Sequence, residues 1–211
     1  MSTDQLSHLL AMSATIAFAV TGVLALADRR VDLFSIVVLG VITAIGGGTI
    51  RDLILDVPVF WSNDLSYVRF AVLASILTFI AQSFFAHPNV YKLMLYIDGL
   101  GVAMFGVGGA VKALELGFGW PIGPLILGVI TAIGGGLMRD VLSGRKTLLM
   151  SNEVYAVPVA LGILTTLVSV HFFPDFKSEA ILAGTIIAFG LRSCAIYWSW
   201  HLPAWFTSTP R

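Results

Sequence analysis

Two stretches of this sequence are nearly the same: residues 40–52 read GVITAIGGGTIRD and residues 128–140 read GVITAIGGGLMRD. Eleven of the thirteen positions are identical, and the second stretch follows the first at an offset of 88 residues. Weaker similarity extends outward, for example between residues 18–22 and 105–109. The pattern indicates an internal duplication with a Gly triplet in the middle of each copy.

The composition indicates a membrane protein. Of the 211 residues, 57% are hydrophobic and only 11% are charged, and the mean hydropathy is +0.92. A soluble domain carries about 25% charged residues, so this chain has too few charges to cover a water-facing surface. Lys+Arg and Asp+Glu balance at 12 each, which argues against a nucleic-acid partner. The single cysteine, Cys194, excludes an intramolecular disulfide and a multi-cysteine metal site. We expect membrane lipids as partners, and no metal site or cofactor.

Seven apolar segments approach the length of about 20 residues that a helix needs to cross a bilayer. They are roughly His8–Ala27, Leu33–Leu55, Ser66–Ala86, Leu93–Leu114, Pro121–Leu142, Asn152–Phe173 and Ala180–Trp200. We therefore predict an all-α integral membrane protein with seven transmembrane helices in one membrane domain, residues 1–211.

The duplicated unit contains three of these helices, and three is an odd number. The second unit must then enter the membrane upside down relative to the first, which predicts an inverted repeat with a pseudo-two-fold axis in the membrane plane. Repeat one covers about residues 8–86 and repeat two about 93–173, and the seventh helix, about 180–200, is added to this core.

The basic residues predict the orientation of the chain. One side of the membrane receives Arg29, Arg30, Lys92, Arg145, Lys146 and Arg211. The other side receives Arg69, Lys112 and Lys177. We expect the amino terminus outside and the carboxyl terminus in the cytoplasm of a cell (inner) membrane. The start of the chain has no Lys or Arg before its first apolar run, so we expect it to stay as a span rather than to be cleaved.

Both Gly triplets fall inside predicted spans, in the second and fifth helices. The residues are Gly46, Gly47, Gly48, Gly134, Gly135 and Gly136. Three glycines in place of alanines cost a helix about 2.5–3 kcal/mol, so we predict that both helices are broken there. The freed carbonyls, with the hydroxyls of Thr43, Thr49 and Thr131, suit a monovalent cation in a pore. The alternative is that glycines only let two helices approach closely.

An Arg-Asp pair follows each triplet: Arg51-Asp52 and Arg139-Asp140. Neighbours on a helix point about 100° apart, so we predict pairing across the pseudo-two-fold axis, Arg51 with Asp140 and Arg139 with Asp52, or with freed carbonyls. The alternative places these residues near the interface, where they snorkel to water.

Two further charges, Asp98 and Lys112, stand in the fourth span, and they lie too far apart to pair with each other. Their counterparts in the first repeat are apolar, namely Leu10, Ala11 and Ala25. Lys112 either biases a gate or reaches the outer interface, so we group Asp98 and Lys112 with the Arg-Asp pairs as a candidate charged or gating network.

The doubled GVITAIGGG-x-x-RD segments in a chain of three, three and one helices resemble the prokaryotic branch of the TRIC family, the trimeric intracellular cation channels. That branch overlaps bacterial duplicated-domain glycine-transporter-like membrane proteins. The resemblance spans about residues 8–200 and implies a homotrimer with one pore per protomer, permeable to K⁺ and Na⁺. It implies gating around the six triplet glycines, with Arg51, Asp52, Arg139, Asp140 and the helix-four residue Lys112 in family roles.

Two main functions therefore stand after the sequence alone. The first is a passive channel for monovalent cations, with K⁺ or Na⁺ as permeant ion and no cofactor. The alternative is a secondary transporter of glycine or another small zwitterion, in which half-helix ends hold the carboxylate. A structural scaffold is a third, weaker reading. An enzyme is not expected, because no nucleophile with an apposed base is visible.

Overall fold

The computed structural model describes residues 3–81, 90–151 and 153–201, and almost all of them are helical. The first repeat forms α1 (Thr3–Leu24), α2 (Leu33–Ile54), the short α3 (Phe60–Asn63) and α4 (Ser66–Ala81). The second repeat forms α5 (Val90–Glu115), α6 (Ile122–Leu142), the 3₁₀ turn η2 (Leu148–Met150) and α7 (Ala156–Phe172). The turn η3 (Pro174–Phe176) and the helix α8 (Lys177–Tyr197) follow.

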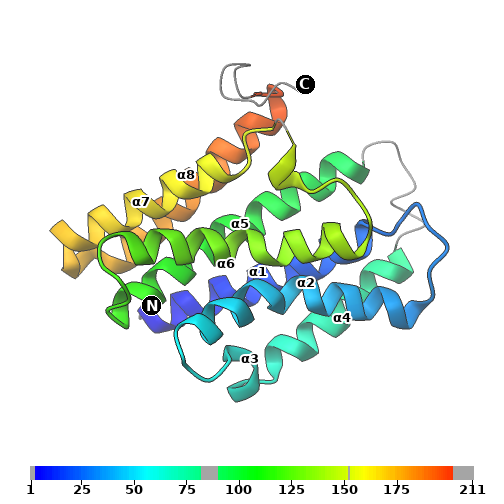
Figure 1. Cartoon of the computed structure of the whole chain (residues 1–211), viewed down its shortest axis with the longest axis horizontal. Coiled ribbons are helices and arrows are strands. Elements are labelled where there is room, and N and C mark those ends of the chain that lie inside the picture. Colours follow the sequence, from blue (N-terminus) through cyan, green and yellow to red (C-terminus); the bar gives the residue numbers. More distant parts are fainter. Residues whose placement is uncertain (1–2, 82–89, 152, 202–211) are drawn as a thin grey trace, which may run out of the picture.

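The long helices lie along one common direction and alternate in sense along the chain (Figure 1). Among the described residues, α1, α2, α5, α6 and α8 are long and apolar enough to cross a membrane. The described parts of α4 and α7 are apolar but shorter, at 16 and 17 residues. The all-helical membrane architecture is thus confirmed, whereas the count of seven spans stays a prediction.

The ends of α2 and α6 show the repeat at the level of single hydrogen bonds. The Val57 amide donates to the Asp52 carbonyl at 3.1 Å, and the Arg145 amide donates to the Asp140 carbonyl at 2.9 Å. These are Schellman motifs, which need one residue of positive φ after the helix. Gly144 takes that position after α6 at φ +62°, and Asp56 takes it after α2 at φ +52°.

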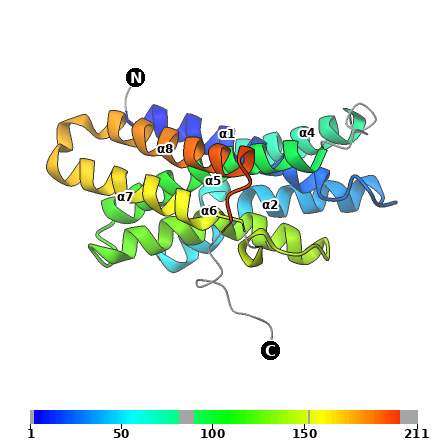
Figure 2. The ribbon, with the colours of Figure 1, turned by 90° about the horizontal axis from the view of Figure 1, so that it is seen from above.

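The core lies between the two repeats, where α1 packs on α5 and α2 packs on α6. Phe18 of α1 and Phe105 of α5 stack at its centre, with ring centroids 5.7 Å apart. The helix α8 packs along α7 and α5 (Figure 2). It therefore covers mainly the second repeat, with fewer contacts to α1, and makes the molecule asymmetric.

The prediction that the second and fifth helices are broken by an unwound turn is wrong, whereas a kink at the triplets stays a prediction. Both α2 and α6 run as single helices through their triplets. The two helices are antiparallel and pack directly against each other at the glycines (Figure 1). Close packing between backbones gives the triplets a role that needs no unwound turn, which is what the alternative interpretation expected.

Candidate functional site

The centre of the candidate site is a crossing between Gly47 of α2 and Gly135 of α6. A Cβ atom on Gly47 would collide with the Thr131 carbonyl and lie 3.2 Å from the Gly135 nitrogen. A Cβ atom on Gly135 would collide with the Thr43 carbonyl and lie 3.9 Å from the Gly47 nitrogen. The repeat offset of 88 residues relates Gly47 to Gly135 and Thr43 to Thr131, so the crossing lies on the pseudo-two-fold axis.

The other triplet glycines are packed as well. A Cβ atom would meet the Met138 sulfur at Gly46, the Phe60 ring at Gly48 and the Gly47 Cα at Gly134. At Gly136 it would lie 3.3 Å from the Tyr155 hydroxyl. In this structure each triplet glycine leaves room for a neighbouring group, so the crossing is tightly packed.

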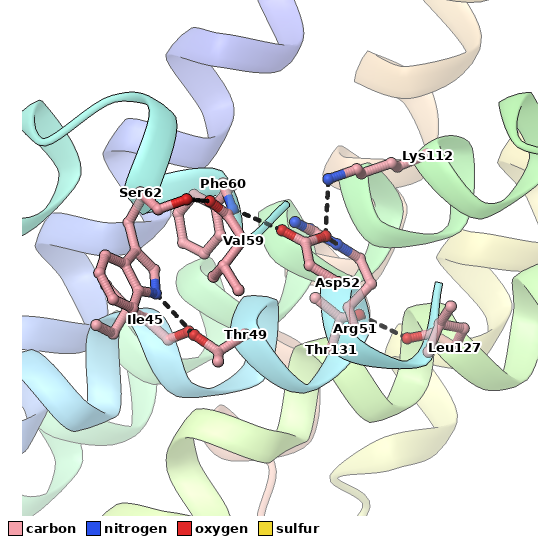
Figure 3. Close-up of polar contacts among 11 residues, drawn as sticks. Ile45, Thr49, Arg51, Asp52, Val59, Phe60, Ser62, Lys112, Leu127 and Thr131 are labelled. Carbon is pink, nitrogen blue, oxygen red and sulfur yellow. Dashed lines mark hydrogen bonds and ion pairs between the residues drawn. The ribbon is translucent and has the colours of Figure 1, made fainter. Parts of the chain in front are cut away.

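Of the three predicted threonines, two lie at the crossing and the third contacts a tryptophan. Thr43 and Thr131 are buried at the crossing, and their hydroxyls donate to the carbonyls of Leu39 and Leu127, four residues earlier. Thr49 donates to its own helix in the same way and accepts from the Trp61 indole at 2.9 Å (Figure 3). A hydroxyl that donates to its helix still offers oxygen lone pairs, so these positions remain candidate cation ligands.

The first charged cluster comprises Arg51, Asp52 and Lys112, and it lies at one end of the crossing (Figure 3). Arg51 Nε and Lys112 Nζ both donate to Asp52 Oδ1, at 2.8 and 2.7 Å. The second carboxylate oxygen accepts the Phe60 amide at 2.8 Å, and the Phe60 ring lies under the Arg51 guanidinium. The side chain of Lys112 remains 32% exposed.

The second charged cluster comprises Arg139, Asp140 and Asp98. Arg139 Nε donates to Asp140 Oδ1 at 2.8 Å, and Arg139 Nη1 donates to Asp98 Oδ1 at 2.6 Å. The other Asp140 oxygen accepts the Leu148 amide at 3.0 Å. The side chains of Arg139 and Asp98 are fully buried. Asp98 Oδ2 and Arg139 Nη2 have no hydrogen-bond partner among the residues that the structure describes.

The predicted pairing across the pseudo-two-fold axis is wrong, because each Arg pairs with the Asp beside it. Each Arg lies four residues beyond its crossing glycine, and the helices are antiparallel. The two Arg-Asp pairs are therefore displaced by about 6 Å in opposite directions along the helix axes. The Arg side chain is long enough to bend toward the next residue, and the prediction from the angle between neighbouring residues did not take this reach into account. Asp98 and Lys112 do not pair with each other, as expected, and each joins a different cluster.

The two clusters carry opposite net charges when all groups are ionised. The first has two cations around one carboxylate, and the second has two carboxylates around one cation. The alternative in which the Arg-Asp residues snorkel to water does not describe them, since Arg51, Asp52, Arg139 and Asp140 are all buried.

Sequence reasoning missed the groups that hold the clusters in place. Phe60 and Leu148 supply equivalent amides, and Tyr67 and Tyr155 stand at equivalent positions, all at the offset of 88. Applying the repeat offset to the loops beyond the motif would have found them. Arg192 of α8 is also buried, where it donates to the Val154 carbonyl and lies over the Tyr155 ring.

A cavity of about 350 Å³ opens beside the first cluster. Its walls come from α1, α2, α3, α4, α5 and α8, and include Ala11, Arg51, Phe60, Tyr67 and Lys112. Asp4 and Glu115 also line it. The cavity leads from the end of the molecule at the start of α1 toward Arg51, which makes it a candidate vestibule.

Comparison with known proteins yields consistent matches over almost the whole chain. A family model described as "Glycine transporter" matches residues 8–83 and 95–171. The inner membrane protein YadS of Escherichia coli (strain K12), named UPF0126, is 37% identical over 194 residues, which cover 90% of this chain and 91% of YadS. The UPF0126 membrane protein YvgT of Bacillus subtilis (strain 168) is 33% identical and covers 93% of this chain and 95% of its own.

Solved structures match the fold closely. The TRIC trimeric intracellular cation channel orthologue from Rhodobacter sphaeroides superposes with a TM-score of 0.86 at 33% identity, over 92% of this chain and 98% of that one. A prokaryotic TRIC channel crystallised in 0.5 M KCl also gives a TM-score of 0.86, at 27% identity, over 94% of this chain and 99% of that one.

Proposed function

The chain belongs to the family of the glycine-transporter model and of the solved TRIC channels, and from this premise we propose that it is a passive channel for monovalent cations, K⁺ and Na⁺. The close match to structures that are described as cation channels supports this function. We further propose a homotrimer with one pore in each protomer, by analogy with the trimeric Rhodobacter sphaeroides orthologue. No bound cofactor and no catalytic step enter this function.

The observation that carries the proposal is the polar column along the antiparallel pair α2 and α6. It begins at the vestibule, passes Arg51 and Asp52, continues by Thr43 and Thr131 at the crossing, and ends at Arg139. Ionisable side chains buried at this depth are costly and mark ion or substrate pathways. A scaffold would have no need for such a column.

We place the gate at the crossing as part of this proposal. The two helices leave no room for a Cβ atom at Gly47 or Gly135, so in this proposal no ion passes while the helices stay this close. Opening requires α2 and α6 to slide or separate there. Because the glycines have no side chains to disengage, we expect both movements to cost little free energy. The motion would shift the helices as units, because neither is unwound at its triplet.

The orientation and location are part of the same proposal. We place the protein in the inner membrane, as the name of the YadS relative states for that protein. The amino terminus and the vestibule would face outward, and the two loops with Arg29, Arg30 and Arg145 would face the cytoplasm, in keeping with the positive-inside rule.

A second candidate function, secondary transport of glycine, is favoured by the description of the family model. Liposomes that contain the purified protein discriminate between the two. A channel predicts K⁺ efflux that collapses an imposed K⁺ gradient without any amino acid, together with no concentrative uptake of labelled glycine. Saturable glycine uptake with no K⁺ leak would overturn the channel and support the transporter.

A further inference from the structure

The surroundings of the two charged clusters correspond through the repeat. Between α1 and α5 the offset is 87 residues: Phe18 corresponds to Phe105, and Gly22 corresponds to Gly109. A Cβ atom on Gly22 would lie 3.0 Å from the Thr43 hydroxyl, and one on Gly109 would lie 2.8 Å from the Thr131 hydroxyl. Asp98 of α5 therefore corresponds to Ala11 of α1.

In the second cluster, the Asp98 carboxylate fills a defined position. Its Oδ1 accepts from Arg139 Nη1 at 2.6 Å. A Cβ atom on Gly136 would lie 3.4 Å from this oxygen and 3.3 Å from the Tyr155 hydroxyl. The carboxylate is thus held among an Arg, a Tyr and a Gly that leaves room for both.

The first cluster has the same Arg and Tyr, as Arg51 and Tyr67, but Ala11 stands at the sequence position of Asp98, and the Phe60 ring lies beside Gly48 where the carboxylate lies beside Gly136. Arg51, Tyr67 and Ala11 line the 350 Å³ cavity. The cluster also has one positive charge more than Asp52 neutralises, and Lys112 lines the same cavity. The cavity therefore gives access to Arg51 in the cluster that lacks a counterpart of the Asp98 carboxylate.

We propose that this cavity is a binding site for a small carboxylate, which pairs with Arg51 from the cavity side as Asp98 pairs with Arg139. A guanidinium binds a carboxylate through paired, charge-assisted hydrogen bonds, and Lys112 adds a second cation. The volume lies at the small end of ligand pockets, which suits a ligand of few heavy atoms. Asp4 and Glu115 in the same cavity offer a counterpart to the ammonium group of an amino acid.

The site goes beyond the proposed function, since binding requires no ion flux. The test therefore uses the purified wild-type protein in detergent, where no ion flux takes place. Acetate, glycine, methylammonium and inorganic phosphate are titrated as separate probes in an isothermal titration calorimeter. We expect saturable binding of acetate or glycine and none of methylammonium. Binding of glycine alone would specify an amino-acid carboxylate and also support the proposal. Binding of phosphate alone, or of no probe, would overturn it.

Two variants tie the binding to this cavity. Ala11→Asp supplies the missing carboxylate from the chain itself, and we expect it to reduce binding at least tenfold. Ala11→Asn is the control of the same size: it also narrows the cavity but brings no charge to Arg51. The unfolding temperature of Ala11→Asp without ligand should exceed that of Ala11→Asn, because only the Asp side chain forms an ion pair with Arg51.

Arg51→Lys keeps the charge and removes the paired donors, so it should weaken carboxylate binding several-fold while the protein remains folded. Undiminished binding in both Ala11→Asp and Arg51→Lys would place the ligand elsewhere and overturn the proposal. This outcome is separate from the loss of channel function, because K⁺ flux in liposomes is measured independently on the same preparations.

Discussion

The two Arg-Asp clusters are built on the same repeated motif, yet they differ in net charge and in access to solvent. Each Arg bonds the following Asp, and each Asp holds the amide of the residue eight positions later. The first cluster has acquired a lysine and opens to a cavity, whereas the second has acquired a second carboxylate and is sealed. Both additions come from α5, and their α1 counterparts are apolar.

The comparison shows that the inverted repeat is symmetric at the helix crossing and asymmetric around the charged clusters. The crossing of α2 and α6 is symmetric because each glycine must accommodate the other helix, so a change on one side requires the same change on the other. The residues around the clusters face unlike surroundings, since α8 packs mainly on the second repeat. The charges there were free to diverge.

The largest expected effect separates the two arginines. Arg139→Met leaves Asp98 and Asp140 as buried carboxylates without a cation, and we expect it to reduce the free energy of unfolding by about 3–5 kcal/mol. Arg51→Met should cost less than half as much, because Lys112 still pairs with Asp52. Denaturant unfolding in micelles, followed by tryptophan fluorescence, measures both. Equal losses would erase the distinction between a sealed and an open cluster.

The crossing should respond symmetrically where the clusters do not. Gly47→Ala and Gly135→Ala each force a Cβ atom against a carbonyl of the other helix, and overpacking of this kind costs about 1–3 kcal/mol. We expect matching losses of stability and a shift of gating in both variants. Gly190→Ala is the control, since a Cβ atom there meets none of the described atoms within 4 Å. A large effect in only one of the triplet variants would show that the crossing is not a shared element.

The excess charge of the first cluster should oppose cation entry. Lys112→Met removes the half-exposed cation and leaves Asp52 paired with Arg51, so we expect a larger unitary K⁺ current with a loss of stability of about 1 kcal/mol or less. Lys112→Arg keeps the charge and should leave the current near that of the wild type. Recordings in symmetric KCl decide the question, and an unchanged or smaller current in Lys112→Met would contradict the electrostatic role of Lys112.

The smallest effect concerns an ion pair that has no counterpart in the repeat. Arg145, after α6, bonds Asp28, after α1, at 2.7 Å. Partial burial opposes ionisation of Asp28, but the hydrogen bond and charge of Arg145 outweigh it and hold the pKa of this carboxyl below its ordinary value of 3.8. The pair therefore stabilises the fold above about pH 4, and its contribution is lost as the pH falls through the lowered pKa.

Asp28→Asn should accordingly lower the free energy of unfolding at pH 7 by about 0.2–1 kcal/mol, the range for exposed pairs. The difference from the wild type should vanish in strong acid, where both side chains are neutral. Unfolding curves at a series of pH values provide the measurement, and a difference that persists in strong acid would assign the effect to something other than this ion pair.

Much of the architecture could be read from the repeat alone. The identity between residues 40–52 and 128–140 predicts the duplication, and the odd number of spans in each unit predicts its inversion. The antiparallel α2 and α6 of the structure agree with that inversion. The composition predicts the membrane class, because too few charges are available to cover a water-facing surface.

The site was harder to predict, because it depends on which helix lies against which. A Gly triplet costs a helix the same whether the backbone unwinds or packs against another backbone, and only the position of Gly135 beside Gly47 decides between them. The pairing of Arg51 failed for a similar reason, since the antiparallel crossing moves Asp140 away. Asp98 and Lys112 were recognised as unusual, but their partners on α6 and α2 lie far away in sequence.

The central claim is that this polar column conducts cations passively, and a planar bilayer with a tenfold KCl gradient tests it most directly. The account predicts discrete current steps whose reversal potential lies near the K⁺ equilibrium value, about 59 mV in magnitude for a monovalent ion. Currents that reverse near the Cl⁻ equilibrium potential, or no steps over many fusions of protein that takes up glycine in liposomes, would contradict it.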